Sequence, residues 1–375
     1  MGKSLKGGAV APLRVGVVGV GFISGMYFET LRRIRDEVRL VRVADLDIAR
    51  AMAVGVAEGV PGGSVDDLLA DPEVDIVLNL TIPAAHADIS LRALEAGKHV
   101  YGEKPLTVTL AEARTVRELA QQRGLWVGCA PDTVLGTGIQ TARRAVDDGL
   151  IGRPVAATAT MAIPGHEAWH PNPDFYYARG GGPLYDMGPY YLHALLTLLG
   201  PVARVSAAAS HPRDERIIAS GPRAGERVPV LTDTHITGLL EHVGGATTTL
   251  TMSFDTVGTR AVPIEVHGLE GSLIVPDPNE FTGTTLLKVR GKDWEPLPVS
   301  AGYEDSARGF GLLDYHRTAA GDVPRADAGI AFHALEIMET MMTASVEGRR
   351  LDLGPAASRP TAVPLTSLSS GRRND

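Results

Sequence analysis

The chain has 375 residues, a net charge of −8 at neutral pH, and an ordinary globular composition with 44% apolar and 21% charged residues. Its length is about twice that of a usual domain, so we expect two domains. The moderate negative charge, without clustered Lys and Arg, argues against nucleic acid as a partner. No apolar run is long enough to span a membrane. With Cys129 as the single cysteine, an internal disulfide is excluded and a cytoplasmic location is expected.

The first part of the chain alternates short β-branched runs with amphipathic helices. This alternation predicts right-handed βαβ crossovers and a doubly wound parallel sheet. The predicted strands are 14–18, 38–45, 74–80, 98–102 and 125–129, and the predicted helices are 22–34, 47–59, 84–97, 110–124 and 138–149.

Beyond about residue 152 the sequence pattern changes to Thr- and Val-rich runs in which polar and apolar residues alternate. Such runs predict an antiparallel sheet. The runs cover 155–163, 204–210, 233–243, 246–255, 264–275 and 285–289, and predicted helices cover 183–199, 305–319 and 327–347.

A glycine-containing turn follows the first strand. Gly19-Val20-Gly21-Phe22-Ile23-Ser24 joins a strand to a helix, where backbone amides can hold a pyrophosphate. Ser24 stands where the usual fingerprint has its third glycine, and a simple tight turn is the alternative. The candidate cofactor contacts of this turn are Gly19, Gly21, Phe22 and Ile23.

Asp45 ends the second strand, where a carboxylate can accept hydrogen bonds from the adenosine ribose. A carboxylate there would repel a 2′-phosphate, and the adjacent Leu46 supplies no cation. We therefore expect NAD as cofactor and NADP as the less favoured one, although Arg42 and Arg50 lie nearby. The alternative role for Asp45 is that of a residue in a strand-end turn.

Four segments carry a more specific pattern: GVVGVGFIS, VADLD, LTIPAAHADISLRALEAGKHVYGEKP and GGGPLYDMGPYYLHALLTLLGPV. In this order and spacing they resemble the Gfo/Idh/MocA family of glucose-fructose oxidoreductases and inositol dehydrogenases. The resemblance covers most of the chain. It implies an α/β protein with an N-terminal Rossmann domain and a C-terminal α/β domain built on an open, mostly antiparallel sheet. One side of that sheet would carry substrate contacts and the other often subunit contacts, as in a homodimer or homotetramer.

The expected boundaries are an N-terminal extension at 1–12, the NAD-binding Rossmann domain at 13–131, and the substrate and oligomerisation domain at 132–354. Residues 355–375 are expected to form a flexible tail, because SLSSGRRND and its surroundings are polar and lack periodicity.

The resemblance also implies roles for the loops after the third and fourth strands. Thr81, Pro83 and His86 would cover the adenosine side of the dinucleotide, while Glu103 and Lys104 would approach the nicotinamide. The Lys104–Pro105 bond is expected to be cis, as this tripeptide often is in the family. Independent alternatives are a helix-start role for His86 and a plain surface loop for Glu103 and Lys104.

Hydride transfer from a secondary alcohol requires that the hydroxyl proton leave. Lys104 is the first candidate acceptor, and we expect burial beside the nicotinamide to depress its pKa. Asp186, Tyr190 and His193 follow one another at helical spacing, so all three are expected on one face of the 183–199 helix.

The family usually has a histidine one turn after this aspartate, and Tyr190 takes that position here. Two versions therefore stay open: Lys104 as proton acceptor with Tyr190 positioning the substrate, or a Lys104-assisted Tyr190 phenolate. Because a phenol is a poor base without a nearby cation, the first is favoured. His193 could replace the missing histidine or simply pack in the core. Asp186 could instead be a partner of the helix dipole.

The loop IPGHEAWHPNPDFYYARGGG precedes this helix and is rich in aromatic and polar side chains. Such residues suit polyols, because sugar C–H faces stack on rings while hydroxyls need polar partners. Trp169 and His170 are therefore substrate-binding candidates together with Lys104, Asp186 and Tyr190, although the aromatic residues could equally cover a domain edge. His166 and His170 lack carboxylate or cysteine partners at ligand spacing, so no metal site is expected. Asp132 could line the cleft or cap a helix.

These features together predict an NAD-dependent dehydrogenase or reductase acting on CH–OH groups of a sugar, sugar derivative or cyclitol. Two alternatives stay open: a glycoside hydrolase that oxidises its sugar transiently with NAD, and a nicotinamide-binding regulator without chemistry. Retention of Lys104 together with Asp186 argues against the regulator.

Overall fold

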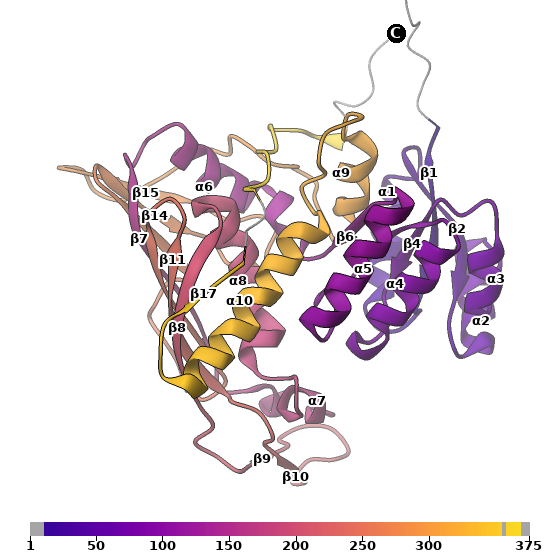
Figure 1. Ribbon diagram of the computed structural model, residues 1–375, viewed down its shortest axis with the longest axis horizontal. Helices are drawn as coiled ribbons and strands as arrows, with labels where there is room; N and C mark the ends of the chain where they lie inside the picture. Colours follow the sequence, from indigo (N-terminus) through magenta and orange to yellow (C-terminus); the bar gives the residue numbers. More distant parts are fainter. Residues whose placement is uncertain (1–10, 355–357, 369–375) are drawn as a thin grey trace, which may run out of the picture.

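The computed structural model describes residues 11–354 and 358–368. Most of the expected N-terminal extension, 1–12, lies outside these residues. A parallel sheet and a larger mixed sheet lie side by side, with helices between them (Figure 1). This arrangement confirms the predicted α/β fold class.

The first sheet is parallel throughout and has the order β3-β2-β1-β4-β5-β6, the strand order of a Rossmann fold. Its central strands read as apolar runs because helices cover both faces of the sheet, and Val15, Val17 and Ile76 are fully buried. The strands are β1 (Leu13–Val18), β2 (Val38–Ala44), β3 (Gly62–Gly63), β4 (Ile76–Asn79), β5 (His99–Gly102) and β6 (Val127–Cys129).

Side-chain caps define where several helices of this domain begin. Thr109 forms a capping box at the start of α5, and Ser64 forms one at the start of α3. Asp47 accepts the Arg50 amide at the start of α2. The short β3 and α3 were not predicted. The helices are α1 (Ser24–Arg33), α2 (Ile48–Glu58), α3 (Val65–Ala70), α4 (His86–Glu95) and α5 (Leu110–Arg123), with the 3₁₀ turn η1 (Pro83–Ala85) before α4.

The second sheet has the order β16-β15-β14-β13-β7-β12-β11-β8-β17, and only its β7–β12 pair is parallel. Buried and partly exposed residues alternate along β11 and β12, so one face packs on helices and the other does not. The strands are β7 (Pro154–Ala162), β8 (Val202–Ser210), β11 (His235–His242), β12 (Thr247–Ser253), β13 (Ile264–Gly268), β14 (Gly271–Val275), β15 (Leu286–Val289), β16 (Glu295–Pro296) and β17 (Leu351–Asp352).

Helices α8 and α10 fill the space between this sheet and the Rossmann domain (Figure 1). Helix α8 packs on β7, β11 and β12, whereas α10 packs on β8 and also contacts α5 and β6 of the first domain. The helices are α6 (Thr137–Asp147), α7 (Asp174–Tyr177), α8 (Pro183–Leu199), α9 (Phe310–Arg317) and α10 (Ala328–Glu347), with 3₁₀ turns η2 (Asp132–Leu135) and η3 (His166–Ala168). Among the described residues, no helix combines the length and apolar character needed to cross a bilayer.

Residues 358–368 pack against the second domain, although the sequence led us to expect them within a flexible tail. Arg359 donates to the Thr197 carbonyl at 2.7 Å and to Asp147 at 2.6 Å, and Val363 is buried. The expected tail residues 355–357 and 369–375 lie outside the described residues.

A buried arginine ties a small hairpin, β9 (Glu215–Ile217) and β10 (Arg227–Pro229), to the aromatic loop. Arg216 is 2% exposed and pairs with both Glu167 and Asp255. Glu167 also accepts the Tyr177 hydroxyl. The hairpin, which was not predicted from the sequence, therefore fixes the segment that carries His166.

We expect Arg216→Met to lower the free energy of unfolding by about 3–5 kcal/mol, because it leaves two buried carboxylates without their cation. Urea denaturation at neutral pH measures the change. Arg227→Met on the same hairpin is the control: its guanidinium is 67% exposed and pairs with the exposed Glu215, so a loss below about 1 kcal/mol is expected. Equal small losses for both variants would contradict a structural role for Arg216.

Candidate active site

The turn after β1 is shaped to receive an anion. Gly19 has φ +94°, and a Cβ there would lie 2.7 Å from the Leu80 backbone, so the turn requires glycine. A Cβ on Gly21 would meet nothing within 4 Å. Helix α1 begins without a side-chain cap at Ile23 and without an acidic residue in its first turn. The Ser24 and Met26 amides donate to the Gly21 and Ile23 carbonyls, whereas the glycine turn and the uncapped start of α1 fit the pyrophosphate of a dinucleotide.

Asp45 stands at the end of β2 with its carboxylate oriented by three contacts, of which the one from Arg50 is also an ion pair. Oδ2 accepts the Val20 amide at 2.9 Å, and Oδ1 accepts the Asp47 amide at 2.9 Å and Arg50 Nη2 at 2.7 Å. Burial alone would raise the pKa of Asp45, but these hydrogen bonds outweigh burial and lower it. The carboxylate is thus charged and fixed beside the turn, and Arg50 is directed toward it.

Three large apolar side chains near this edge are unusually exposed. Phe22, Leu46 and Ile82 follow β1, β2 and β4, which are neighbours in the sheet, and are 101%, 94% and 70% exposed. Exposed apolar groups at adjacent strand ends are typical of a ligand surface. Ile23, in contrast, packs partly against the core.

The loop after β4 is connected to the loop after β5 by His86. Its ring nitrogens lie 2.7 Å from the Pro105 carbonyl and 3.0 Å from the Thr81 carbonyl. Burial lowers the pKa of His86, although both hydrogen bonds oppose this shift, so the neutral ring donates to one carbonyl at a time. His86, expected to contact cofactor, has both nitrogens engaged within the protein and positions the two loops. Thr81 bonds Asn79 Oδ1 at 2.6 Å, and Pro83 begins η1.

Lys104 reaches across to the second domain. Its Nζ donates to Asp186 Oδ1 at 3.1 Å and to the Asp186 carbonyl at 2.8 Å. The Lys104–Pro105 bond is cis, as expected. Glu103 accepts the Tyr27 hydroxyl at 2.7 Å and the Lys104 amide at 3.0 Å, which fixes the start of the loop.

Asp186 also binds a histidine from the aromatic loop. His166 Nε2 lies 3.0 Å from Asp186 Oδ2, and the His166 ring packs on Tyr176 at 3.9 Å between centroids. Asp186 therefore joins Lys104 and His166 in one polar cluster. Although burial would raise the pKa of Asp186, Lys104 and His166 outweigh it and lower the pKa.

Tyr190 lies beside this cluster and His193 does not. The Lys104 ammonium lies 5.3 Å from the Tyr190 ring centre, and Arg308 Nη1 donates to the Tyr190 hydroxyl at 3.1 Å. His193 is 2% exposed and bonds the Pro189 carbonyl at 2.7 Å, and burial lowers its pKa to about 4. The helix turn that carries His193 faces the core, so a catalytic role for it is not supported.

In the structure, the pKa of Lys104 moves in the direction opposite to the one expected beside a bound nicotinamide. Burial would lower its pKa, but Asp186, with Tyr190 and Glu103, outweighs burial and raises it. Without cofactor the pKa of Lys104 is thus raised, because the ammonium has a close carboxylate partner; the depressed pKa expected beside a bound nicotinamide stays a prediction. Burial also raises the pKa of Tyr190, against the opposing effects of Lys104 and Arg308.

The aromatic loop presents part of its side chains outward. Trp169 is 58% exposed and contacts the edge of His170, which is half-buried. Tyr177 instead points inward to Glu167. Trp169 and His170 thus border the cluster through His166, against which Trp169 packs at 5.4 Å.

Comparison with family models matches residues 13–130 to the oxidoreductase family with an NAD-binding Rossmann fold and residues 139–274 to the GFO/IDH/MocA C-terminal domain. The chain is also 30% identical to trans-1,2-dihydrobenzene-1,2-diol dehydrogenase from Bos taurus, over 80% of this chain and 85% of that protein. The chain belongs to the Gfo/Idh/MocA family.

Two further comparisons give the same kind of protein. The chain is 30% identical to 1,5-anhydro-D-fructose reductase from Ensifer adhaerens, over 71% of this chain and 77% of that protein. A crystal structure of an NAD binding oxidoreductase from Klebsiella pneumoniae superposes with a TM-score of 0.80 at 23% identity, over 92% of this chain and 100% of that one. As a Gfo/Idh/MocA protein, the chain is an NAD-binding oxidoreductase.

Two polar residues of the candidate site were missed in the sequence. Arg308 bonds Tyr190, and Asn279 Oδ1 accepts Arg308 Nη2 at 3.3 Å. Both come from loops far from the recognised motifs, so no spacing rule links them to Tyr190. Asp132, for which a cleft or a capping role was open, accepts the amides of Gly309 and Gly311 at 2.8 and 3.0 Å and so holds the loop that carries Arg308.

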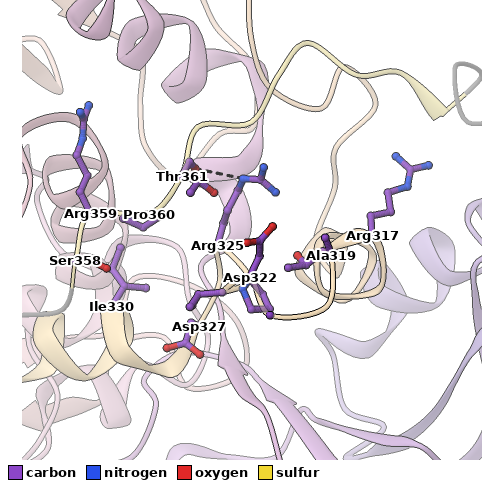
Figure 2. Close-up of a pocket in the computed structure, with 14 residues that line it drawn as sticks. Arg317, Ala319, Asp322, Arg325, Asp327, Ile330, Ser358, Arg359, Pro360 and Thr361 are labelled. Carbon is purple, nitrogen blue, oxygen red and sulfur yellow. Dashed lines mark hydrogen bonds between the residues drawn. The ribbon is translucent and has the colours of Figure 1, made fainter. Parts of the chain in front are cut away.

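A separate cavity of about 550 Å³ lies between the loop after α9 and residues 358–361 (Figure 2). Its arginines are engaged within the protein: Arg325 donates to the Thr361 carbonyl at 3.2 Å, Arg317 pairs with Glu37, and Arg359 pairs with Asp147. None of the expected site residues lines it. Within the described ranges, no three His, Cys, Asp or Glu side chains are arranged to hold a metal ion.

We expect a higher kcat/KM with NAD than with NADP, and a smaller preference in Asp45→Ala. Removing the carboxylate ends its repulsion of a 2′-phosphate and releases Arg50, which can then attract one. Steady-state kinetics with both cofactors measure the two ratios. Asp47→Ala is the control, since it removes a neighbouring carboxylate that caps α2 and forms no hydrogen bond with the Arg50 guanidinium. A wild-type preference for NADP of about tenfold, which corresponds to ~1.4 kcal/mol, would contradict the role of Asp45.

Proposed function

We propose that the protein is an NAD-dependent dehydrogenase or reductase for a secondary alcohol or ketone of a sugar, sugar derivative or cyclitol. The observation that carries this proposal is the meeting of Lys104, from the end of β5, with Asp186 and Tyr190 of the second domain. Proton-handling groups thereby face the carboxyl ends of the Rossmann strands, where this fold binds its cofactor. The names of the two relatives contain a diol and an anhydro-sugar, which supports this substrate class.

The bound nicotinamide would accept or deliver the hydride at the carbinol carbon. In the oxidative direction the C–H bond breaks with its electron pair, the hydroxyl proton passes to a base, and the carbonyl forms. The Gly19–Gly21 turn and Asp45 would hold the dinucleotide. Trp169 and His170 would contact the polyol, whose C–H faces stack on aromatic rings.

We propose Tyr190 as the proton acceptor, with Lys104 as the cation that assists it. The Asp186 carboxylate keeps Lys104 as an ammonium, and an ammonium has no lone pair to accept a proton. Burial raises the pKa of Tyr190, but Lys104 and Arg308 lie on two sides of it and both oppose that rise by favouring the phenolate. His166 would orient Asp186 and so keep Lys104 directed toward the phenol.

We also propose an oligomeric state and a location. The sheet face opposite α8 and α10 carries partly exposed Thr237 and Thr251 and the 40% exposed Leu239, which suits a contact between subunits of a homodimer or homotetramer. The single cysteine, Cys129, is buried and free, and we propose a cytoplasmic enzyme.

A panel of polyols, aldoses, ketoses and glycosides tests the reaction class. We expect net formation of reduced cofactor with at least one polyol, followed by its absorbance at saturating NAD. A hydrolase that oxidises its sugar transiently would instead cleave a glycoside without net NADH. Binding of NAD without turnover of any substrate would favour a regulator.

Two single mutants test the proton acceptor. We expect Lys104→Ala to lower kcat by about 10²–10⁴-fold, the usual size of a general acid–base effect, with little change in NAD affinity. Tyr190→Phe should cost at least as much, and the alkaline-favouring limb of the kcat profile should vanish with the hydroxyl. If Lys104 itself accepts the proton, Tyr190→Phe will cost far less and keep that limb. Near-normal turnover in both mutants would contradict either role.

A further inference from the structure

Arg308 is a half-buried cation that pairs with no carboxylate among the described residues. Its Nη1 donates to the Tyr190 hydroxyl at 3.1 Å and its Nη2 to Asn279 Oδ1 at 3.3 Å, both neutral acceptors. Its Nε is buried and has no hydrogen-bond partner. Nη1 and Nη2 each carry two N–H groups and use one in these bonds, so one N–H on each terminal nitrogen remains without an acceptor in the described part of the chain.

Three other buried cations of the described chain form ion pairs, whereas Lys98, which is 8% exposed, bonds only the Asp71 carbonyl. Arg143 pairs with Asp147, Arg216 with Glu167 and Asp255, and Lys104 with Asp186. Burying a charge without a partner is costly, so a guanidinium that bonds only neutral acceptors beside the proposed reacting groups is suited to take an anionic partner from outside the chain.

The two carboxylates that interact electrostatically with Arg308 already accept hydrogen bonds from other groups. Glu103 accepts the Tyr27 hydroxyl and the Lys104 amide, and Asp132 Oδ2 accepts the amides of Gly309 and Gly311. Neither carboxylate forms an ion pair with Arg308.

The position of Arg308 is fixed by its loop. Gly309 has φ +100°, and a Cβ on Gly311 would lie 2.3 Å from the Tyr101 hydroxyl. Both amides are held by the buried Asp132. A preorganised guanidinium of this kind is suited to recognise a specific anion.

We propose that the substrate is a sugar acid whose carboxylate binds Arg308 while its reacting hydroxyl lies at Tyr190 and Lys104. This proposal rests on the proposed function and adds the charge of the substrate. The guanidinium fork matches a planar carboxylate. Because Arg308 bonds the Tyr190 hydroxyl directly, the carboxylate would lie one or two carbons from the carbinol carbon. The redox step is unchanged, and the carboxylate takes no part in it.

Matched pairs of acidic and neutral substrates test this assignment. The probes are aldonates against the corresponding alditols and uronates against the corresponding aldoses, each assayed by NADH formation. We expect wild type to favour the acid of a pair by about 10–100-fold in kcat/KM, the size of a charge-assisted hydrogen-bonded pair. In Arg308→Gln the acid-to-neutral ratio should fall to near unity, mainly through KM for the acid.

The ratio cancels any effect of Arg308 that acts through Tyr190, because that effect reaches both substrates. Arg308→Lys should keep part of the preference, since the charge remains without the fork. Arg39→Gln is the matched control: it removes an exposed arginine at the start of β2, so the ratio should not change.

Three results would overturn the proposal. One is a wild-type preference for neutral substrates, or for sugar phosphates over sugar acids. Another is an equal loss on both substrates in Arg308→Gln, which would restrict Arg308 to Tyr190. A third is a larger dissociation constant for NAD in Arg308→Gln with an unchanged acid-to-neutral ratio, which would assign Arg308 to cofactor binding. All three leave the proposed dehydrogenase intact, whereas absence of NADH with every polyol and sugar acid would contradict that function itself.

Discussion

An ion pair between Lys104 and Asp186 connects the two domains at the point where cofactor and substrate would meet. Lys104 follows β5 of the Rossmann sheet, and Asp186 lies in the first turn of α8. The pair decides the charge of the lysine, because the carboxylate outweighs the cost of burying the ammonium. It also sets the direction of Asp186, whose second oxygen receives His166. The proposed acid–base role of Tyr190 follows from this pair, since a lysine held as an ammonium can support a phenolate but cannot accept a proton.

Buried carboxylates away from the reacting groups support this arrangement. Glu167 and Asp255 surround Arg216 and hold the loop that carries His166. Asp132 holds the backbone of the loop that carries Arg308. In both cases a buried acid fixes the backbone near a polar side chain of the site, so the side chain is positioned before any ligand binds.

Periodicity in the sequence was sufficient for the long elements. The βαβ alternation gave the Rossmann sheet, and the alternating Thr-rich runs gave the second sheet, because side-chain period reports which faces are buried. The short β3, β9 and β10 carry too few residues to show a period. Residues 358–368 looked featureless because they are held by single contacts such as Arg359 with Asp147.

The candidate site was predicted where it lies in recognisable motifs and missed where it depends on distance in space. Helical spacing placed Tyr190 and His193 on one face, but the helix runs into the core, so His193 is buried two turns beyond Asp186. Arg308 comes from a loop with no motif. The raised pKa of Lys104 depends on a separation of 3.1 Å from a residue in the other domain, which burial alone could not indicate.

His86 connects two loops of the candidate site. Its ring stands between the carbonyls of Thr81 and Pro105, one in the loop after β4 and the other directly after Lys104. The imidazole lies between the loop after β4 and the loop after β5, which are otherwise connected through the strands of the sheet. Because the neutral ring donates its one N–H to either Thr81 or Pro105, a shift of the Thr81 loop would change how the ring packs between the two carbonyls. In the proposed binding mode, the ring would connect the loop at the adenosine end of the cofactor to the loop that carries the lysine at its nicotinamide end.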